Sequence, residues 1–198
     1  QSFIMRRGMG PHEATKTGKD SAVCGDCKHS WYLGGKCYVL VFQAPKAAHK
    51  GMTNNPFASF IAPWQASILL IGRALRCGSY GDPSAVPLPI WHTLLAHTKN
   101  HTGYTHQWRN IMFEGYLSFL MASVDSLDEA RLALSKGYRY FRVKSRGETE
   151  KLEGEIECLS DSKNISCDKC GLCDGDRASM GNANARKSVW IEEHGNRI

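Results

Sequence analysis

The chain has 198 residues, 42% of them hydrophobic, and a formal net charge of +6. This length fits one globular domain with a core of its own, and the composition excludes a disordered chain. No apolar run approaches the roughly 18–20 residues of a membrane span, so we expect no membrane segment. We also expect no secretory signal, because Arg6 and Arg7 follow the first apolar residues instead of preceding them. The positive charge is concentrated in residues 1–50, which permits contact with nucleic acid without requiring it.

The first third of the chain is expected to consist mainly of loops. A short strand is predicted at residues 3–5 and a cysteine loop at 21–37. Residues 38–42 form a five-residue apolar run, which predicts either a buried strand or the start of a helix. Residues 45–63 contain three prolines, so we predict that they are largely loop.

Between residues 64 and 145 the apolar periodicity predicts a β/α core. The predicted elements are helices at 64–72 and 87–99, strands at 75–80, 103–108, 119–124 and 138–143, and a helix that begins at Ser126. Ser126 and Glu129 have the spacing of a capping box, and Gly137 is suited to end that helix. A strand–helix–strand unit of this length implies parallel strands joined by a right-handed crossover.

Repeated β/α units predict an α/β fold. The chain is shorter than the roughly 250 residues of an eight-unit barrel, and both of its ends are taken up by cysteine loops. We therefore expect a single domain built as a partial (β/α) barrel or an open parallel sheet, with metal-binding loops at 21–37 and 158–175. In either architecture the functional residues lie at the C-terminal ends of the strands.

The C-terminal cysteines have metal-ligand spacing. Cys158, Cys167, Cys170 and Cys173 form the pattern C-x8-C-x2-C-x2-C. A C-x2-C-x2-C run is typical of iron–sulfur ligation, whereas structural zinc sites more often pair two separate Cys-x-x-Cys units. The tight spacing favours a metal site in a reducing compartment over disulfides. We predict a 4Fe-4S cluster here, with zinc as the alternative.

The N-terminal cysteines form a second group, which lacks one ligand. Cys24, Cys27 and Cys37 are spaced C-x2-C-x9-C. His29 or Cys77 could supply a fourth ligand, and a zinc site completed by His29 or one cluster shared by both groups are alternatives. If the fourth position stays open, an exogenous ligand can bind the metal there. Cys77 alone, in an apolar segment, is better explained as a core residue.

Polar residues at the predicted strand ends are candidates for catalysis and ligand binding. Tyr80 and Asp82 follow the first strand of the core, and Asp82 is suited either to act as a base or to cap the next helix. His106, at the end of the next strand, is the best acid–base candidate. Arg142 could hold an anionic ligand, although a solvated position at the rim is the simpler expectation.

Five motifs follow one another in an order that resembles a family of poorly characterised proteins encoded by bacteriophages and mobile elements. They are Cys24-Gly-Asp-Cys27 followed by Cys37-Tyr38, then Gly-Ser-Tyr-Gly-Asp-Pro, Gly-Tyr-Thr-His-Gln-Trp, Met-Ala-Ser-Val-Asp and the terminal C-x2-C-x2-C. The resemblance covers roughly residues 15–195. It implies a phage or prophage origin and a bacterial host cytoplasm as the workplace, and it brings no settled activity.

The combination of a partial barrel, an N-terminal cysteine loop and a C-terminal cysteine group is also similar to radical S-adenosylmethionine enzymes. Their usual loop is C-x3-C-x2-C, from which C-x2-C-x9-C departs, so S-adenosylmethionine is kept only as an alternative cofactor. We expect an iron–sulfur protein in redox or radical chemistry that interacts with an electron donor or a small-molecule ligand. The alternative is a non-enzymatic zinc or iron–sulfur module that binds nucleic acid or a protein.

Overall fold

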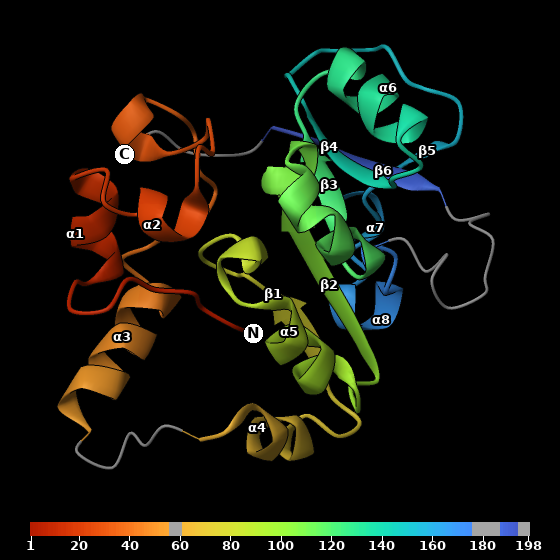
Figure 1. The fold of residues 1–198 in the computed structure, drawn as a ribbon. Helices are drawn as coiled ribbons and strands as arrows, with labels where there is room; N and C mark the ends of the chain where they lie inside the picture. The colour runs from red at the N-terminus through yellow and green to blue at the C-terminus, as the bar shows by residue number, and fades with distance from the viewer. Residues whose placement is uncertain (56–60, 176–186, 194–198) are drawn as a thin grey trace.

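The computed structural model describes residues 1–55, 61–175 and 187–193, and a six-stranded sheet forms its centre (Figure 1). Every strand pair is parallel, and the strand order is β1-β2-β3-β4-β6-β5. The strands are β1 (Ala74–Cys77), β2 (Asn100–Thr105), β3 (Met121–Val124), β4 (Tyr140–Lys144), β5 (Glu155–Glu157) and β6 (Ser188–Glu192). The sheet is open, with β1 and β5 at its edges, so the fold is the expected α/β class with an open parallel sheet.

Helices and 3-10 turns cover one face of this sheet. They are α5 (Leu88–Leu95), η4 (Ile111–Ser118) and α6 (Leu127–Ser135). Trp91 of α5 packs with Leu75 and Cys77 of β1, while Ala130 and Ala133 of α6 pack with β3 and β4. The two clusters form the main core, because parallel strands must bury apolar side chains against a covering layer.

The opposite face is covered by the C-terminal cysteine segment. This segment contains α7 (Leu159–Ser162) and α8 (Cys167–Cys170), which Figure 1 shows behind the sheet. Cys173 packs there with Met121 and Val189, which project from β3 and β6. A short cysteine loop thus stands where a helix would otherwise cover the sheet.

The segment that carries the N-terminal cysteines lies beside the carboxyl end of the sheet, and its helices are α1 (Pro11–Lys16), α2 (Ser21–Cys24), η1 (Trp31–Leu33) and α3 (Ala44–Asn54). Helix α4 (Pro63–Leu69) lies near the amino end of β1, close to α5 (Figure 1). The predicted loop at 45–63 is wrong for α3: its proline, Pro45, lies in the first turn, where a missing N–H costs nothing. The prediction for 38–42 is also wrong, because only Val41 of that run is buried and the backbone is irregular.

The predictions for the middle of the chain hold, with shifts at the boundaries. The unit β3–α6–β4 is parallel, and Ser126 accepts the Glu129 N–H at 3.2 Å as the helix cap. Strand β2 starts three residues before its predicted position, and β1 ends at Cys77. The predicted strand at 3–5 is reduced to a single bridge between Phe3 and Tyr80. Strands β5 and β6 were not predicted. No described helix is long and apolar enough to cross a membrane.

Candidate metal centres

The N-terminal cysteine loop lies across the carboxyl ends of three neighbouring strands. The Asp82 N–H, in the turn after β1, donates to Val23 O at 2.7 Å. Gln107, just after β2, donates to Asp26 at 2.7 Å. Lys28 contacts Asp125, which follows β3, at 3.0 Å. These contacts bring the cysteine loop to the sheet edge at which parallel α/β folds place their functional residues.

Three thiols, those of Cys24, Cys27 and Cys37, belong to this loop, and their sulfur atoms do not all lie within 4.8 Å of one another. Burial raises the pKa of Cys24, and the nearby Asp20, Cys27 and Cys37 raise it further. Burial likewise raises the pKa of Cys27 to about 12. The same thiols can bind a metal ion if the metal displaces their protons.

His106 comes closest to this thiol group from the sheet. Its Nε2 atom lies 3.8 Å from Cys27 Sγ and 3.1 Å from Ser123 Oγ. Burial lowers the pKa of His106, against the opposing effect of Asp125 and Asp82. A neutral imidazole can accept a proton or bind a metal. His106, which we predicted as an acid–base group, is therefore also a candidate ligand beside Cys27.

The other two catalytic candidates are held by protein groups. Both oxygens of Asp82 accept hydrogen bonds, from Ser84 N and Thr105 Oγ1 at Oδ1 and from His106 N at Oδ2. The carboxylate therefore caps the following turn. Capping was one of the two roles expected for Asp82, the other being that of a base. Tyr80 is 3% exposed, and its hydroxyl lies 3.4 Å from Thr15 Oγ1. Its neighbours are the N-terminal core residues Val23 and Val41.

A compact set of nitrogen and oxygen atoms lies next to the thiols. Among the described residues, the three-residue set with candidate ligand atoms within 4.8 Å of one another is His29, His106 and Asp125. His29 Nε2 and Asp125 Oδ1 are 2.7 Å apart. Burial acts to raise the pKa of Asp125, but His29 and Lys28 lower it to about 2. The sequence pattern identified His29 and His106 separately and gave no sign that Asp125 joins them.

The C-terminal group places four thiols in one segment on the face of the sheet opposite α5 and α6, although no three of their sulfur atoms lie within 4.8 Å of one another. Burial raises the pKa of Cys173 to about 12, and Cys158, Cys167 and Cys170 each add to the rise. Gly171, with φ of 62°, turns the chain after α8 so that Cys173 returns to the sheet. There Cys173 O accepts the Gly103 N–H at 3.0 Å. All eight cysteines of the chain are free thiols.

Arg139 fastens this segment to the sheet. Its guanidinium donates to Asp174 Oδ1 at 3.1 Å and to the carbonyl oxygens of Leu172, Gly175 and Lys187 at 2.7–3.0 Å. Arg139 is 4% exposed and Asp174 is fully buried, so the anchor is shielded from solvent. The cysteine segment is thus held by polar contacts as well as by packing.

Polar residues connect the two cysteine groups. Arg76, on β1, donates to the hydroxyl of Tyr38 at 2.9 Å, and Tyr38 directly follows Cys37. Burial acts to lower the pKa of Arg76, but its neighbours Tyr38, Tyr104 and Cys167 raise it. Tyr104 in turn acts to lower the pKa of the Cys173 thiol. Arg76 therefore places a positive charge next to the C-terminal thiols and contacts the N-terminal loop.

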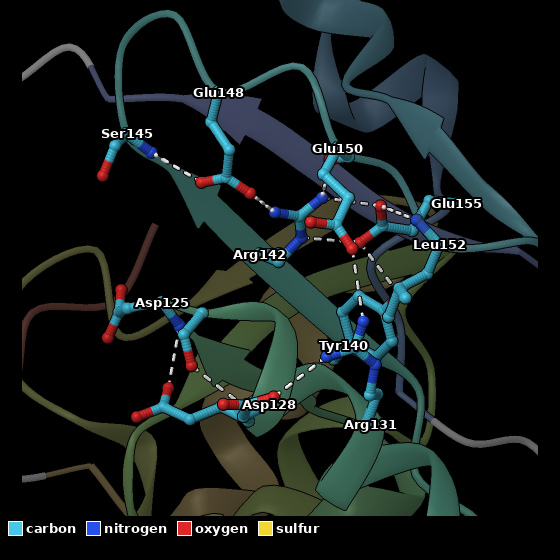
Figure 2. Close-up of polar contacts among 12 residues, drawn as sticks. Asp125, Asp128, Arg131, Tyr140, Arg142, Ser145, Glu148, Glu150, Leu152 and Glu155 are labelled. Atoms are coloured by element: carbon cyan, nitrogen blue, oxygen red, sulfur yellow. Dashed lines mark hydrogen bonds and ion pairs between the residues drawn. The ribbon is translucent and has the colours of Figure 1, made fainter.

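Arg142 is engaged by carboxylates of the protein itself (Figure 2). Its Nε and one terminal nitrogen each donate to Glu155 at 2.7 Å, and the other terminal nitrogen contacts Glu148. The Arg142 side chain is fully buried, which corrects the expectation of a solvated rim position. The guanidinium that we predicted to hold an anionic ligand binds Glu148 and Glu155 instead. Cys77 is 1% exposed in the core, as predicted.

Comparison of the chain with protein-family models, with curated proteins and with solved structures found no match. The function proposed for this protein therefore depends on the residues at the carboxyl edge of the sheet and on the face opposite α5 and α6.

Proposed function

We propose that this protein is an iron–sulfur protein that takes part in redox or radical chemistry. Cys158, Cys167, Cys170 and Cys173 would hold a 4Fe-4S cluster, which when bound supplies one-electron transfer. The observation that carries this proposal is the C-x2-C-x2-C spacing of these cysteines, on a segment in which Cys158 and Cys173 pack against one face of the sheet.

The surroundings of the four cysteines support a cluster. A thiolate-bound cluster carries negative charge, and the guanidinium of Arg76 interacts with Cys167. Tyr104 acts to lower the pKa of the Cys173 thiol against the effect of burial. Charge and hydrogen bonds at the sulfur atoms are the means by which proteins set the potential of such clusters. These two residues are suited to that role.

The N-terminal group is proposed as the second, reactive metal site. Cys24, Cys27 and Cys37 lie at the carboxyl edge of the sheet, beside His106. Arg76 donates to Tyr38, which follows Cys37, and interacts with Cys167, so it connects this loop with the C-terminal group. A small-molecule ligand would enter at the strand ends, and an external electron donor would serve the C-terminal site.

A reducing compartment suits eight free thiols, and we propose the cytoplasm of a bacterial host, in keeping with the phage-like motif order. The test is anaerobic purification of the full chain followed by iron and acid-labile sulfide analysis and absorption spectroscopy. We expect iron and sulfide in equal amounts and a broad thiolate-to-iron band in the visible region. Stoichiometric zinc without sulfide would overturn the proposal and favour a zinc module.

A pair of cysteine variants localises the cluster. Cys170→Ala should lose the iron and sulfide of the C-terminal site. Cys77→Ala removes a buried thiol that packs with Leu75 and Trp91 and should keep the full content. Equal iron and sulfide in the wild type and in Cys170→Ala would show that the C-terminal group is not the cluster site.

A further inference from the structure

Three side chains from three separate segments converge at the carboxyl edge of the sheet. His29 belongs to the N-terminal loop, His106 follows β2 and Asp125 follows β3. Their candidate ligand atoms all lie within 4.8 Å of one another. Because β2 and β3 are parallel neighbours, their ends deliver His106 and Asp125 to the same place.

Asp125 and His106 are positioned by further contacts. Lys28 Nζ lies 3.0 Å from Asp125 Oδ2, which leaves Oδ1 facing His29. The Asp125 N–H donates to Glu129 Oε2 at 2.8 Å. The backbone N–H of His106 is bound by the Asp82 carboxylate. Such outer contacts orient metal ligands in proteins.

The geometry points to a mononuclear site for a divalent first-row metal ion, which we propose is held by His29, His106 and Asp125 and is distinct from the two thiolate sites. Two imidazoles and one carboxylate are the ligand set of non-haem Fe²⁺ sites, and the same donor types serve catalytic zinc. Metal–ligand distances of about 2.1 Å place neighbouring ligands about 3 Å apart. The 2.7 Å between His29 and Asp125 needs only a small change to reach that separation.

Three protein ligands leave coordination positions for water or a substrate oxygen. The ion would then sit beside Cys27, whose sulfur lies 3.8 Å from His106. The site does not depend on the cluster proposal, because its donors are nitrogen and oxygen. It would bind small molecules that carry an oxygen or nitrogen donor, at the edge where the cysteine loop meets the sheet.

Mn²⁺ is a suitable probe, because it favours oxygen and nitrogen donors over thiolates. The full chain is titrated with Mn²⁺, and loss of the free-ion signal is followed by electron paramagnetic resonance. We expect one bound ion per chain, with pulsed measurements detecting two imidazole nitrogens. His29→Ala and Asp125→Asn should each weaken binding about ten-fold or more. His29→Ala should also remove one of the two nitrogen couplings.

A control makes the result specific. His92→Ala removes an exposed histidine of α5 and should leave Mn²⁺ binding unchanged. No bound Mn²⁺ in the wild type, or wild-type affinity in His29→Ala and Asp125→Asn, would overturn the proposal.

Discussion

The Asp82 carboxylate and the backbone of His106 are joined by a 2.8 Å hydrogen bond. The other oxygen of Asp82 accepts Thr105 Oγ1 and the Ser84 N–H. One buried carboxylate thus ties the turn after β1 to the end of β2, and it fixes the point from which the His106 ring extends toward Cys27. Asp82 is a positioning residue for this edge of the sheet.

Asp82→Asn should lower the free energy of unfolding, because an amide NH₂ would face an N–H or O–H donor in place of an accepting oxygen. An unmade hydrogen bond in a buried position costs about 1–3 kcal/mol, and we expect a loss of that size in urea denaturation. Asp128→Asn is the matched control, since Asp128 is 94% exposed and pairs with Arg131 on the surface. If the two variants were equally stable, the Asp82 contacts would not hold the edge together.

The helix cap of α6 gives a second test. Ser126→Ala removes the oxygen that accepts the Glu129 N–H, so the free energy of unfolding should fall by about 1 kcal/mol. Ser135→Ala is the control, because Ser135 lies at the end of the same helix and is exposed, and its hydroxyl donates only to Leu132 O. A loss for Ser126→Ala no larger than that for Ser135→Ala would contradict a capping role.

The sequence predicts elements well where local signals agree. Ser126, Glu129 and Gly137 mark α6, and its flanking apolar runs become β3 and β4. Strand β6 was missed although Val189-Trp190-Ile191 is apolar, because it inserts between β4 and β5 out of chain order. β5 has only three residues and depends on its pairing with β6. Local periodicity carries no information about such long-range pairing.

For the candidate sites too, some features could be predicted from local sequence and others could not. The cysteine spacings are local patterns and were visible in the sequence. The contacts of Cys27 with His106 and of His29 with Asp125 join residues 79 and 96 positions apart, and only the fold brings them together. Arg142 was misjudged because a buried arginine needs carboxylate partners, and Glu148 and Glu155 come from the segment after β4.

The buried ion pair of Arg142 and Glu155 predicts a stability that depends on pH. Removing one partner of such a pair costs about 3–5 kcal/mol, so Glu155→Gln should be strongly destabilised at pH 7. Burial acts to raise the pKa of Glu155, but Arg142, Leu152 and Tyr140 lower it overall below its usual 4.5. The stabilisation is therefore present above that pH and is lost as the pH falls through the lowered pKa.

The measurement is urea denaturation of wild type and Glu155→Gln at pH 7 and at pH values below 4.5. The difference between the two proteins should shrink in acid. Glu150→Gln is the control, because Glu150 is 61% exposed and its side chain makes only a surface contact with Arg131. A difference between wild type and Glu155→Gln that stayed constant across this range would rule out the ionised pair as the source of stability.

Gly175 tests whether close packing against the sheet holds the C-terminal cysteines. Its φ is 78°, and an added Cβ would lie 2.4 Å from the backbone of Phe119 and Leu120, which cannot move aside. Gly154 has a φ of 83° with open space around it, so Gly154→Ala measures left-handed strain alone, about 1–2 kcal/mol. Gly175→Ala should lower the free energy of unfolding clearly more in urea denaturation, because it must also push the segment that carries Cys173 off the sheet.

If iron is bound as proposed, Gly175→Ala should reduce the iron and sulfide content while Gly154→Ala keeps it. Equal losses of stability in the two variants would show that close packing at Gly175 does not hold the segment, and that the contacts of Arg139 and Cys173 anchor it instead.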